Sequence, residues 1–260
     1  MYKKDRLYPG IKVLLIFSLI GMMNCSRTFH KVNVESGYIQ MDGEGQSDQK
    51  DIDSIISPYR EKLAEEMNEV IGTFGNTMIK SRPESTLGNW MCDALQIKAG
   101  DIFNEEVDCT IHNYGGIRLS SIQEGPVTVG TIFELMPFDN FLVLLEMKGE
   151  TLRQFCDHMA IGIGWPVSKE LSYKIAHDKA VEITINEKEL DDNRIYRICS
   201  TDYVANGGDN ASFLKGLPIK ISSVYVRDAL IDYMKGLTQE GVAATSANDG
   251  RVTIKELMQE

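Results

Sequence analysis

The sequence predicts an α+β fold rather than a doubly wound parallel sheet. Segments with apolar residues at helical spacing are mixed with short apolar segments typical of strands, and no regular strand–helix–strand repeat connects them. The 260 residues are 43% hydrophobic and 25% charged, as is ordinary for a globular protein. A chain of this length and composition can bury a core in one large domain or two small ones.

The first 25 residues predict a secretory signal. Lys3, Lys4 and Arg6 precede an apolar run over residues 11–23, and a transmembrane helix needs a longer run of ~20 residues. Cys25 follows this run and resembles the lipidated cysteine of bacterial lipoproteins; the alternative is a plain signal peptide with a chance cysteine. We expect an exported protein of the bacterial cell envelope, in the periplasm or at the cell surface, with a lipid anchor in the membrane at Cys25.

The first half of the mature chain begins with a polar, glycine-containing tether over residues 26–50, and residues 51–260 follow as one domain. Apolar residues at helical spacing predict helices over 51–70 and over 86–99. Thr86 is placed to cap the second of these helices. An extended segment lies between them at 71–79, and a strand is predicted at 107–113.

The second half continues the mixture of helices and strands. A short helix opens at Thr128 or Gly130 and ends before Pro137, which cannot continue it. An apolar strand follows at 141–148, and Gly149 starts a helix that runs through His158 and Met159. The remaining pattern predicts strands near 168–176, 179–185 and 194–201, a helix over 224–235 and a last short element at 252–257.

The charge and the cysteines exclude some classes of function. A net charge of −11 makes the chain a poor nucleic-acid binder, because binding to phosphates needs a basic face. The cysteines of the domain lack zinc-finger spacing and predict buried free thiols rather than a metal site. They are Cys92, Cys109, Cys156 and Cys199.

Residues 111–118, Ile-His-Asn-Tyr-Gly-Gly-Ile-Arg, end the strand predicted at 107–113. Asn113, the two glycines and Arg118 would present backbone N–H groups and a guanidinium at a sheet edge. Such groups suit an anionic or polyhydroxylated small molecule. The alternative is a hairpin-like loop in which Arg118 caps a carbonyl.

Two further loops carry aromatic side chains. Phe138 stands at the junction between a helix and a strand, where it could stack on a flat ring or simply fill the core. Tyr203 and Asp209 follow the strand at 194–201; the carboxylate could accept both hydroxyls of a vicinal diol, or the segment could be an ordinary turn. Taken together, the three loops predict a nucleoside site that stacks the base, binds the ribose and holds a phosphate.

These three segments, with Leu-Gly-Asn-Trp-Met-Cys-Asp-Ala-Leu at 87–95, resemble the C-terminal, substrate-binding domain of the 5′-nucleotidase/UDP-sugar hydrolase family over roughly residues 50–237. The resemblance implies a layered α/β/β/α fold. It further implies roles for six residues. Phe138 and Tyr203 would sandwich the base, Asp209 would bind the ribose hydroxyls, Asn113 and Arg118 would contact the nucleoside and its phosphate side, and Gly164 would lie beside the base.

Three positions depart from the family's pattern. Tyr114 and Asp139 each stand where the family has glycine, which would reshape one loop and add a negative charge beside Phe138. Thr86 stands where some members have a second arginine, and the loss of that positive charge would weaken phosphate binding.

The family's catalytic domain, a metallophosphatase with two metal ions, has no counterpart in this chain. Its Asp-x-His and Gly-Asn-His motifs are missing, and the four histidines, His30, His112, His158 and His177, are scattered. We therefore expect no catalytic residue, metal ligand or cofactor in this chain. By resemblance it would be the nucleotide- or nucleoside-recognition half of a 5′-nucleotidase-type hydrolase that acts in nucleotide catabolism. A separate metallophosphatase subunit would supply the divalent metal pair. The alternatives are a non-catalytic nucleoside-binding lipoprotein and a structural or interaction module that has lost its ligand.

Overall fold

The computed structural model of this chain describes residues 49–255, with side chains from residue 52 onward. The predicted signal, the lipidation site at Cys25 and nearly all of the tether lie outside these residues. The chain divides into two units, residues 1–52 and 53–260, and the description below concerns the second.

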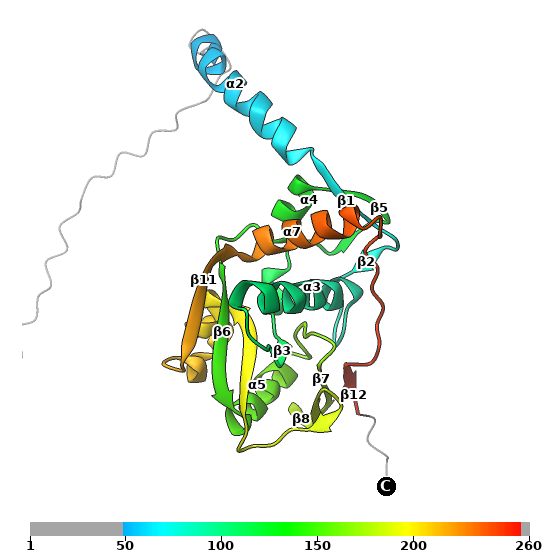
Figure 1. Cartoon of the computed structure of the whole chain (residues 1–260), viewed down its shortest axis with the longest axis vertical. Coiled ribbons are helices and arrows are strands. Elements are labelled where there is room, and N and C mark those ends of the chain that lie inside the picture. Colours follow the sequence, from blue (N-terminus) through cyan, green and yellow to red (C-terminus); the bar gives the residue numbers. More distant parts are fainter. Residues whose placement is uncertain (1–48, 256–260) are drawn as a thin grey trace, which may run out of the picture. The chain divides into compact units, whose positions relative to one another are not determined.

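Helices occur at six places in the described part of the chain (Figure 1). They are α2 (Gln49–Met67), α3 (Thr86–Phe103), α4 (Val129–Leu135), α5 (Gly149–Ile161), α6 (Asp202–Ala205) and α7 (Val226–Gln239). Short 3₁₀ turns occur at η1 (Tyr114–Gly116), η2 (Gly208–Asn210) and η3 (Ser212–Leu214). Between residues 49 and 255, no helix has both the length and the apolar character needed to cross a membrane.

The strands of the described residues form two four-stranded sheets and two short two-stranded ones. The first large sheet has the order β11-β6-β10-β3, the second has the order β12-β7-β8-β9, and the small sheets pair β1 with β5 and β2 with β4. The strands are β1 (Val70–Phe74), β2 (Met78–Ile79), β3 (Cys109–Thr110), β4 (Ser121–Ile122), β5 (Gly125–Thr128), β6 (Phe141–Lys148), β7 (Leu171–Ala176), β8 (Lys179–Ile185), β9 (Lys188–Glu189), β10 (Ile195–Thr201), β11 (Ile219–Tyr225) and β12 (Val252–Ile254).

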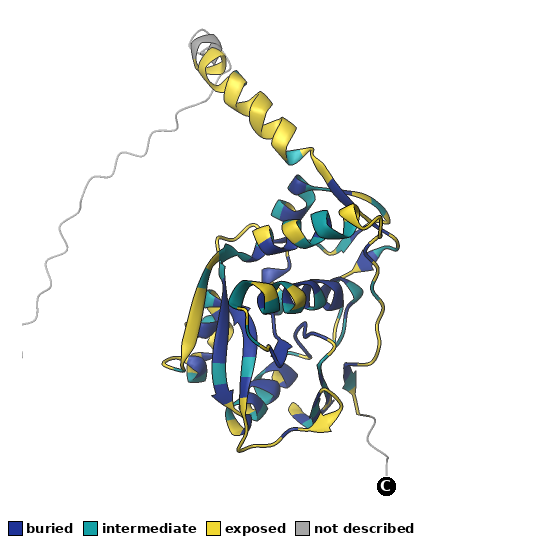
Figure 2. Cartoon of the chain, in the orientation of Figure 1, coloured by how far each residue is buried: buried dark blue, intermediate teal, exposed yellow. Residues whose placement is uncertain are grey.

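Strand β6 is buried on both of its faces, which explains why its sequence is apolar throughout rather than alternating. Leu142 and Leu144 point into one hydrophobic core, which they share with α3 and α7. Val143 and Leu145 point into another, which they share with α5 and with β7 and β8 of the second sheet. The domain thus consists of layers of helices and sheets around two cores (Figures 1 and 2), and the predicted α+β class is confirmed.

Helix α3 begins at Thr86 as predicted, but its cap is the residue before. The hydroxyl of Ser85 accepts a hydrogen bond from Gly88 N at 2.9 Å, with Ser85 in the extended conformation that a capping residue needs. Thr86 lies in the first turn instead, and its hydroxyl accepts from Ile79 N at 2.8 Å. The prediction that Thr86 is the cap was wrong, since two adjacent hydroxyl residues both satisfy the sequence signal.

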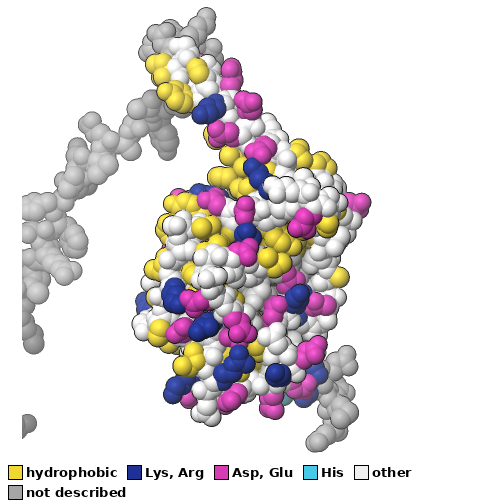
Figure 3. Space-filling model, viewed as in Figure 1, with side chains coloured by type: hydrophobic (Ala, Val, Ile, Leu, Met, Phe, Trp, Pro, Cys, Tyr) yellow, Lys and Arg dark blue, Asp and Glu magenta, His cyan; other side chains and the backbone are white. Residues whose placement is uncertain are grey.

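The surface of the domain carries charges of both signs, and its cysteine thiols are buried. On the face shown in Figure 3, basic side chains lie among acidic ones. The four cysteines of the domain are buried free thiols, as predicted. Burial raises the pKa of Cys92, Cys109, Cys156 and Cys199, so these thiols are poor nucleophiles.

Candidate functional site

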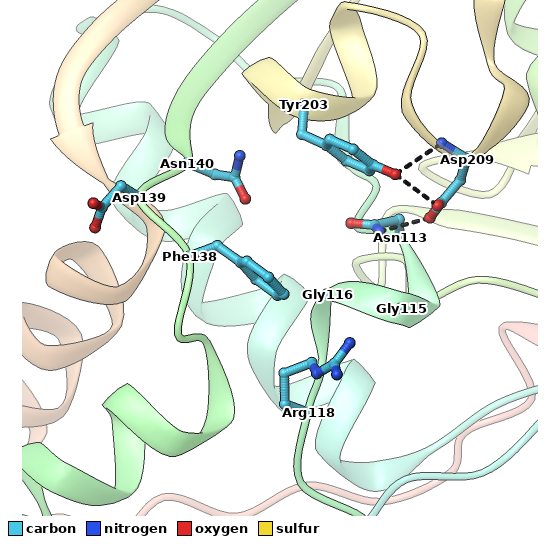
Figure 4. Close-up of a pocket in the computed structure, with 9 residues that line it drawn as sticks. All are labelled: Asn113, Gly115, Gly116, Arg118, Phe138, Asp139, Asn140, Tyr203 and Asp209. Carbon is cyan, nitrogen blue, oxygen red and sulfur yellow. Dashed lines mark hydrogen bonds between the residues drawn. The ribbon is translucent and has the colours of Figure 1, made fainter. Parts of the chain in front are cut away.

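A cavity of about 400 Å³ opens at one edge of the first large sheet (Figure 4). Three segments far apart in the sequence form it: the loop after β3, the loop between α4 and β6, and the loop after β10. Its lining residues are Asn113, Gly115, Gly116, Arg118, Phe138, Asp139, Asn140, Tyr203 and Asp209. Five of the six residues predicted to contact a ligand are among them.

The pairing of the strands brings these segments together. β10 runs parallel to β3, with Cys199 opposite Thr110, so both strands end at the same edge of the sheet. β6 is antiparallel to β10 and begins where β10 ends, with Leu142 opposite Thr201. The chain entering β6 therefore meets the chain leaving β3 and β10, and Asn140 Nδ2 joins two of the loops by donating to Asp202 Oδ1 at 3.0 Å.

Two aromatic rings project into the cavity from different loops. Phe138 and Tyr203 are 38% and 43% exposed, although each ring would be more stable if buried. Figure 4 shows both rings pointing into the space between their loops, with Arg118 near Phe138 and Asp209 near Tyr203. Two exposed rings at one cavity are a suitable surface for a flat apolar group of a ligand.

Glycine at position 208 allows the ring of Tyr203 to pack against its own loop. A Cβ atom at Gly208 would lie 2.6 Å from Cδ1 of Tyr203, closer than side chains can approach. Tyr203 itself lies in α6 rather than at the end of a strand, because the hydroxyl of Thr201 caps a short helix by accepting from Val204 N at 3.1 Å. The position of the ring is thus set by the turn of the chain around it.

Asp209 is hydrogen-bonded through both carboxylate oxygens. Tyr203 donates its hydroxyl to Oδ1 at 2.9 Å, and Asn113 Nδ2 donates to Oδ2 at 2.7 Å. The bond to Asp209 raises the pKa of the Tyr203 hydroxyl. A carboxylate oxygen can accept more than one hydrogen bond, so each oxygen keeps capacity for a donor from a ligand.

Basic side chains gather around Tyr114, one of the departures from the family's pattern. Lys80 Nζ and Arg82 Cζ lie 4.0 Å and 3.9 Å from the centre of the Tyr114 ring. Burial and the charges of Arg118 and Arg82 lower the pKa of Lys80. Within residues 52–255 none of these three cations has a carboxylate at ion-pair distance, so an anionic group would stabilise the cluster.

The carboxylate of Asp139, a second departure, is paired with a cation. Arg227 Nη1 lies 2.6 Å from Asp139 Oδ1, and the same nitrogen donates to the carbonyl of Phe138 at 3.3 Å. Helix α7 therefore supplies a counter-charge to the loop that carries Phe138. The negative charge added beside the cavity is largely offset.

Gly164 and His112 do not line the cavity. Gly164 adopts a φ of +90° after α5, and its N–H donates to the carbonyl of Met159 at 2.9 Å. A side chain there would collide with the carbonyl of Pro83, so packing requires the glycine. His112 is 1% exposed, and burial lowers its pKa to about 4.

A second cavity, of about 390 Å³, adjoins the first and shares Gly115 and Asp209 with it. It brings His158 into the site, a residue that the sequence placed on a helix without a role. Its lining residues are Arg82, Tyr114, Gly115, His158, Ile161, Gly162, Trp165, Asp209 and Asn210. No signal in the sequence could have revealed His158, since α5 reaches the site only through tertiary packing. Among the residues described, no group of three or more His, Cys, Asp or Glu side chains is placed to hold a metal ion.

Comparison with known proteins matches residues 70–216 to the family described as the C-terminal domain of 5′-nucleotidase. A 5′-nucleotidase from Diplobatis ommata is 26% identical over 216 residues, which are 68% of this chain and 37% of that protein. A 5′-nucleotidase from Vibrio vulnificus (strain CMCP6) is 26% identical over 184 residues, 66% of this chain and 32% of that protein. This chain thus spans well under half of their length.

The fold also matches a solved structure. The crystal structure of a 5′-nucleotidase precursor from Thermus thermophilus superposes with a TM-score of 0.67 and 24% sequence identity. The match covers 80% of this chain and 43% of that one. At this level of identity the likeness shows a shared fold.

Proposed function

Because the chain belongs to the family of 5′-nucleotidase C-terminal domains, we propose that its cavity binds a nucleotide or nucleoside and that it serves as the recognition half of a 5′-nucleotidase-type phosphohydrolase. The observation that carries this proposal is the pair of exposed rings at one cavity, with a carboxylate near one ring and a guanidinium near the other. A cavity of about 400 Å³ is large enough for a nucleoside.

Each part of a nucleotide has a suitable partner in the cavity. The base would stack between Phe138 and Tyr203, which lose exposed apolar surface when the base enters. The ribose hydroxyls would donate to the carboxylate of Asp209. The phosphate would lie toward Arg118, whose guanidinium carbon is 5.7 Å from the centre of the Phe138 ring.

Hydrolysis, on this proposal, needs a separate metallophosphatase subunit with a pair of divalent metal ions. The sequence supports this division, since none of its four histidines lies in an Asp-x-His or a Gly-Asn-His motif. The recognition domain would hold the base and the ribose while the partner brings its metals to the phosphate. Closure of two domains around a substrate would then be replaced by docking of two chains.

Ligand-observed NMR with adenosine and AMP, up to millimolar ligand, tests the binding site. We expect both compounds to bind the wild-type chain and binding to be lost in Phe138→Ala. Tyr59→Ala is the matched control, because Tyr59 is an exposed aromatic side chain on α2 that does not line either cavity. The proposal fails if neither compound binds, or if Phe138→Ala binds them as well as Tyr59→Ala does.

We also propose that the chain is exported and attached to a bacterial envelope membrane through a lipid on Cys25. The basic residues, the apolar run over 11–23 and the cysteine after it support this, and they lie outside the described residues. Metabolic labelling with a radioactive fatty acid in a bacterial host should mark the wild-type chain and leave Cys25→Ala unlabelled. Equal labelling of both would overturn the assignment of the anchor.

A further inference from the structure

Asp209 lies in a strained loop that needs support from outside. Its φ and ψ are 49° and 38°, in the left-handed region that residues other than glycine seldom adopt. Asn210, which follows Asp209 directly, also has a positive φ, of 66°. Two successive residues other than glycine in this region are unfavourable, and such strain persists only where surrounding groups hold the chain in place.

Three side chains from different elements hold Asp209. The Tyr203 hydroxyl accepts from the Asp209 N–H at 3.2 Å as well as donating to Oδ1, and Asn113 Nδ2 donates to Oδ2. The third is His158, whose Nε2 lies 2.9 Å from the carbonyl oxygen of Asp209. A carbonyl oxygen only accepts hydrogen bonds, so Nε2 of His158 carries the proton and donates it.

The ring of His158 is itself fixed. It projects from the last turns of α5, and edge-on contacts with Trp165 and Phe213 hold it at centre-to-centre distances of 5.5 Å and 5.6 Å. Trp165 and Phe213 also pack edge-on against Phe155 of α5. The donor that faces Asp209 is therefore carried by a rigid cluster of aromatic side chains rather than by a mobile loop.

The hydrogen bonds already made by Asp209 define what its carboxylate can still accept. Tyr203 occupies one acceptor position on Oδ1, and Asn113 occupies one on Oδ2. A carboxylate oxygen can accept two hydrogen bonds, so Oδ1 and Oδ2 each keep one free acceptor position for a ligand. The 2′ and 3′ hydroxyls of a ribose are two neighbouring donors that could fill both positions, whereas a 2′-deoxyribose would leave one position unused.

We propose that His158 is a positioning residue that holds Asp209 in the orientation needed to bind both ribose hydroxyls, and that the site thereby selects ribonucleosides over 2′-deoxyribonucleosides. This inference rests on the proposed nucleoside site. His158 would then set the preference for ribose over 2′-deoxyribose by acting through Asp209.

Calorimetric titration of the full-length chain with adenosine and with 2′-deoxyadenosine tests this inference. The wild type should bind adenosine about tenfold more tightly, as expected for one hydrogen bond to a charged acceptor. His158→Phe keeps an aromatic ring but removes the donor, and it should reduce the ratio of the two affinities to less than about threefold. His158→Gln can place an amide N–H near the position of Nε2 and should restore part of the ratio.

Two further variants make the result decisive. His177→Gln changes an exposed histidine in the turn between β7 and β8 and should keep the wild-type ratio. Tyr203→Phe removes only the hydroxyl and should lower the ratio, which tests the same fixation of Asp209 if His158→Phe does not fold. An unchanged ratio in the folded variants would overturn the inference, as would equal binding of both nucleosides by the wild type. Failure of the wild type to bind either one would instead overturn the proposed function.

Discussion

His112 is an uncharged, buried histidine directly before the loop at 113–118. Its Nδ1 lies 3.0 Å from the carbonyl oxygen of Asn113, and its Nε2 is buried without a partner among the described residues. Burial lowers its pKa to about 4, although Asn113 and the charge of Asp209 act in the opposite direction. The histidine of an unfolded chain has a pKa of about 6.5, so the unfolded state takes up a proton at a pH where the folded state does not.

Stability should therefore fall as the pH drops below about 6.5 toward 4. Between pH 7 and pH 5 the contribution of His112 to the free energy of unfolding should fall by an amount on the order of 2 kcal/mol. Urea unfolding at both pH values would measure this, and His112→Asn should remove that part of the pH dependence. His177→Asn, at an exposed turn, is the control and should behave as the wild type. The same pH dependence in His112→Asn would contradict the assignment.

Arg227 should matter for anionic ligands more than for neutral ones. It offsets the charge of Asp139 at the rim of the cavity, so Arg227→Gln would leave that carboxylate unpaired near a phosphate. Asp139 is largely exposed, so water screens its charge, and we expect AMP affinity to fall only about two- to fivefold. Adenosine affinity should change less, because adenosine carries no charge.

A double variant separates charge from structure at this position. Arg227→Gln combined with Asp139→Asn removes both charges and should return AMP affinity close to the wild-type value. If AMP affinity remains low in the double variant, Arg227 acts through its bond to the carbonyl of Phe138 rather than through charge. Calorimetric titration of AMP and adenosine against both variants gives the comparison.

The sequence predicted five of the cavity's residues because each is tied to a local pattern: an aromatic at an element junction, or a polar residue in a glycine-containing loop. The supporting residues could not be found in this way. Arg227, Lys80 and His158 reach the site from a helix or a segment remote in the sequence, and only the folded chain reveals their partners. Gly164 was assigned to the base by resemblance, whereas in the structure it packs against Pro83.

Among the secondary-structure elements, the segment before β12 is bound to helix α3 by a buried arginine, Arg251. The guanidinium of Arg251 donates to both oxygens of Asp93 on α3 at 2.8 Å and 3.1 Å, and to the carbonyl of Val167 at 3.0 Å. It also pairs with Asp249 at 2.6 Å. Burial opposes the charge of Arg251, but its bonds to Asp249 and Asp93 raise its pKa.

Replacing Arg251 by Met should therefore be costly. A buried ion pair that loses one partner is typically destabilised by about 3–5 kcal/mol. Asp93 and Asp249 are partly exposed here, so we expect roughly 2–3 kcal/mol in urea unfolding. Lys255→Met is the control, because Lys255 pairs with Glu182 at the surface and such pairs contribute less than about 1 kcal/mol. Equal losses in both variants would contradict this role of Arg251.

Elements with a decisive local pattern were predicted well, and those that depend on tertiary context were not. Both ends of β6 and the start of α5 at Gly149 were predicted correctly, because apolar residues mark the buried faces of these elements in the sequence. β11 was missed: it is an edge strand with mostly exposed side chains and lacks the alternation that a half-buried strand shows.

Helix α2 was predicted from an apolar stripe that the described residues do not cover. Ile55 and Tyr59 on this stripe are 67% and 76% exposed. Helical spacing therefore predicted the helix correctly, but it could not predict whether the stripe is packed within the described domain. An amphipathic pattern predicts that a helix has an apolar face, but it does not identify what packs against that face.

For the molecule as a whole, binding and catalysis should be separable. The proposed site accounts for recognition of the base, the ribose and the phosphate side, and the chemical step is assigned to another chain. We expect the full-length chain alone, supplied with Mg²⁺, Mn²⁺ or Zn²⁺, to leave AMP intact. Added to a metallophosphatase subunit loaded with its metals, it should raise the rate of AMP hydrolysis to a plateau as its concentration increases.

The rate gain should depend on the cavity, because the recognition chain would act by holding AMP against the metals of its partner. Phe138→Ala should lower the gain at subsaturating AMP, whereas Tyr59→Ala should lower it only if the exposed face of α2 takes part in docking. Phosphate release measured with the wild type and both variants therefore distinguishes substrate binding from subunit contact. Metal-dependent hydrolysis of AMP by this chain alone would contradict the division of labour, as would a partner whose rate is unchanged at saturating amounts of the chain.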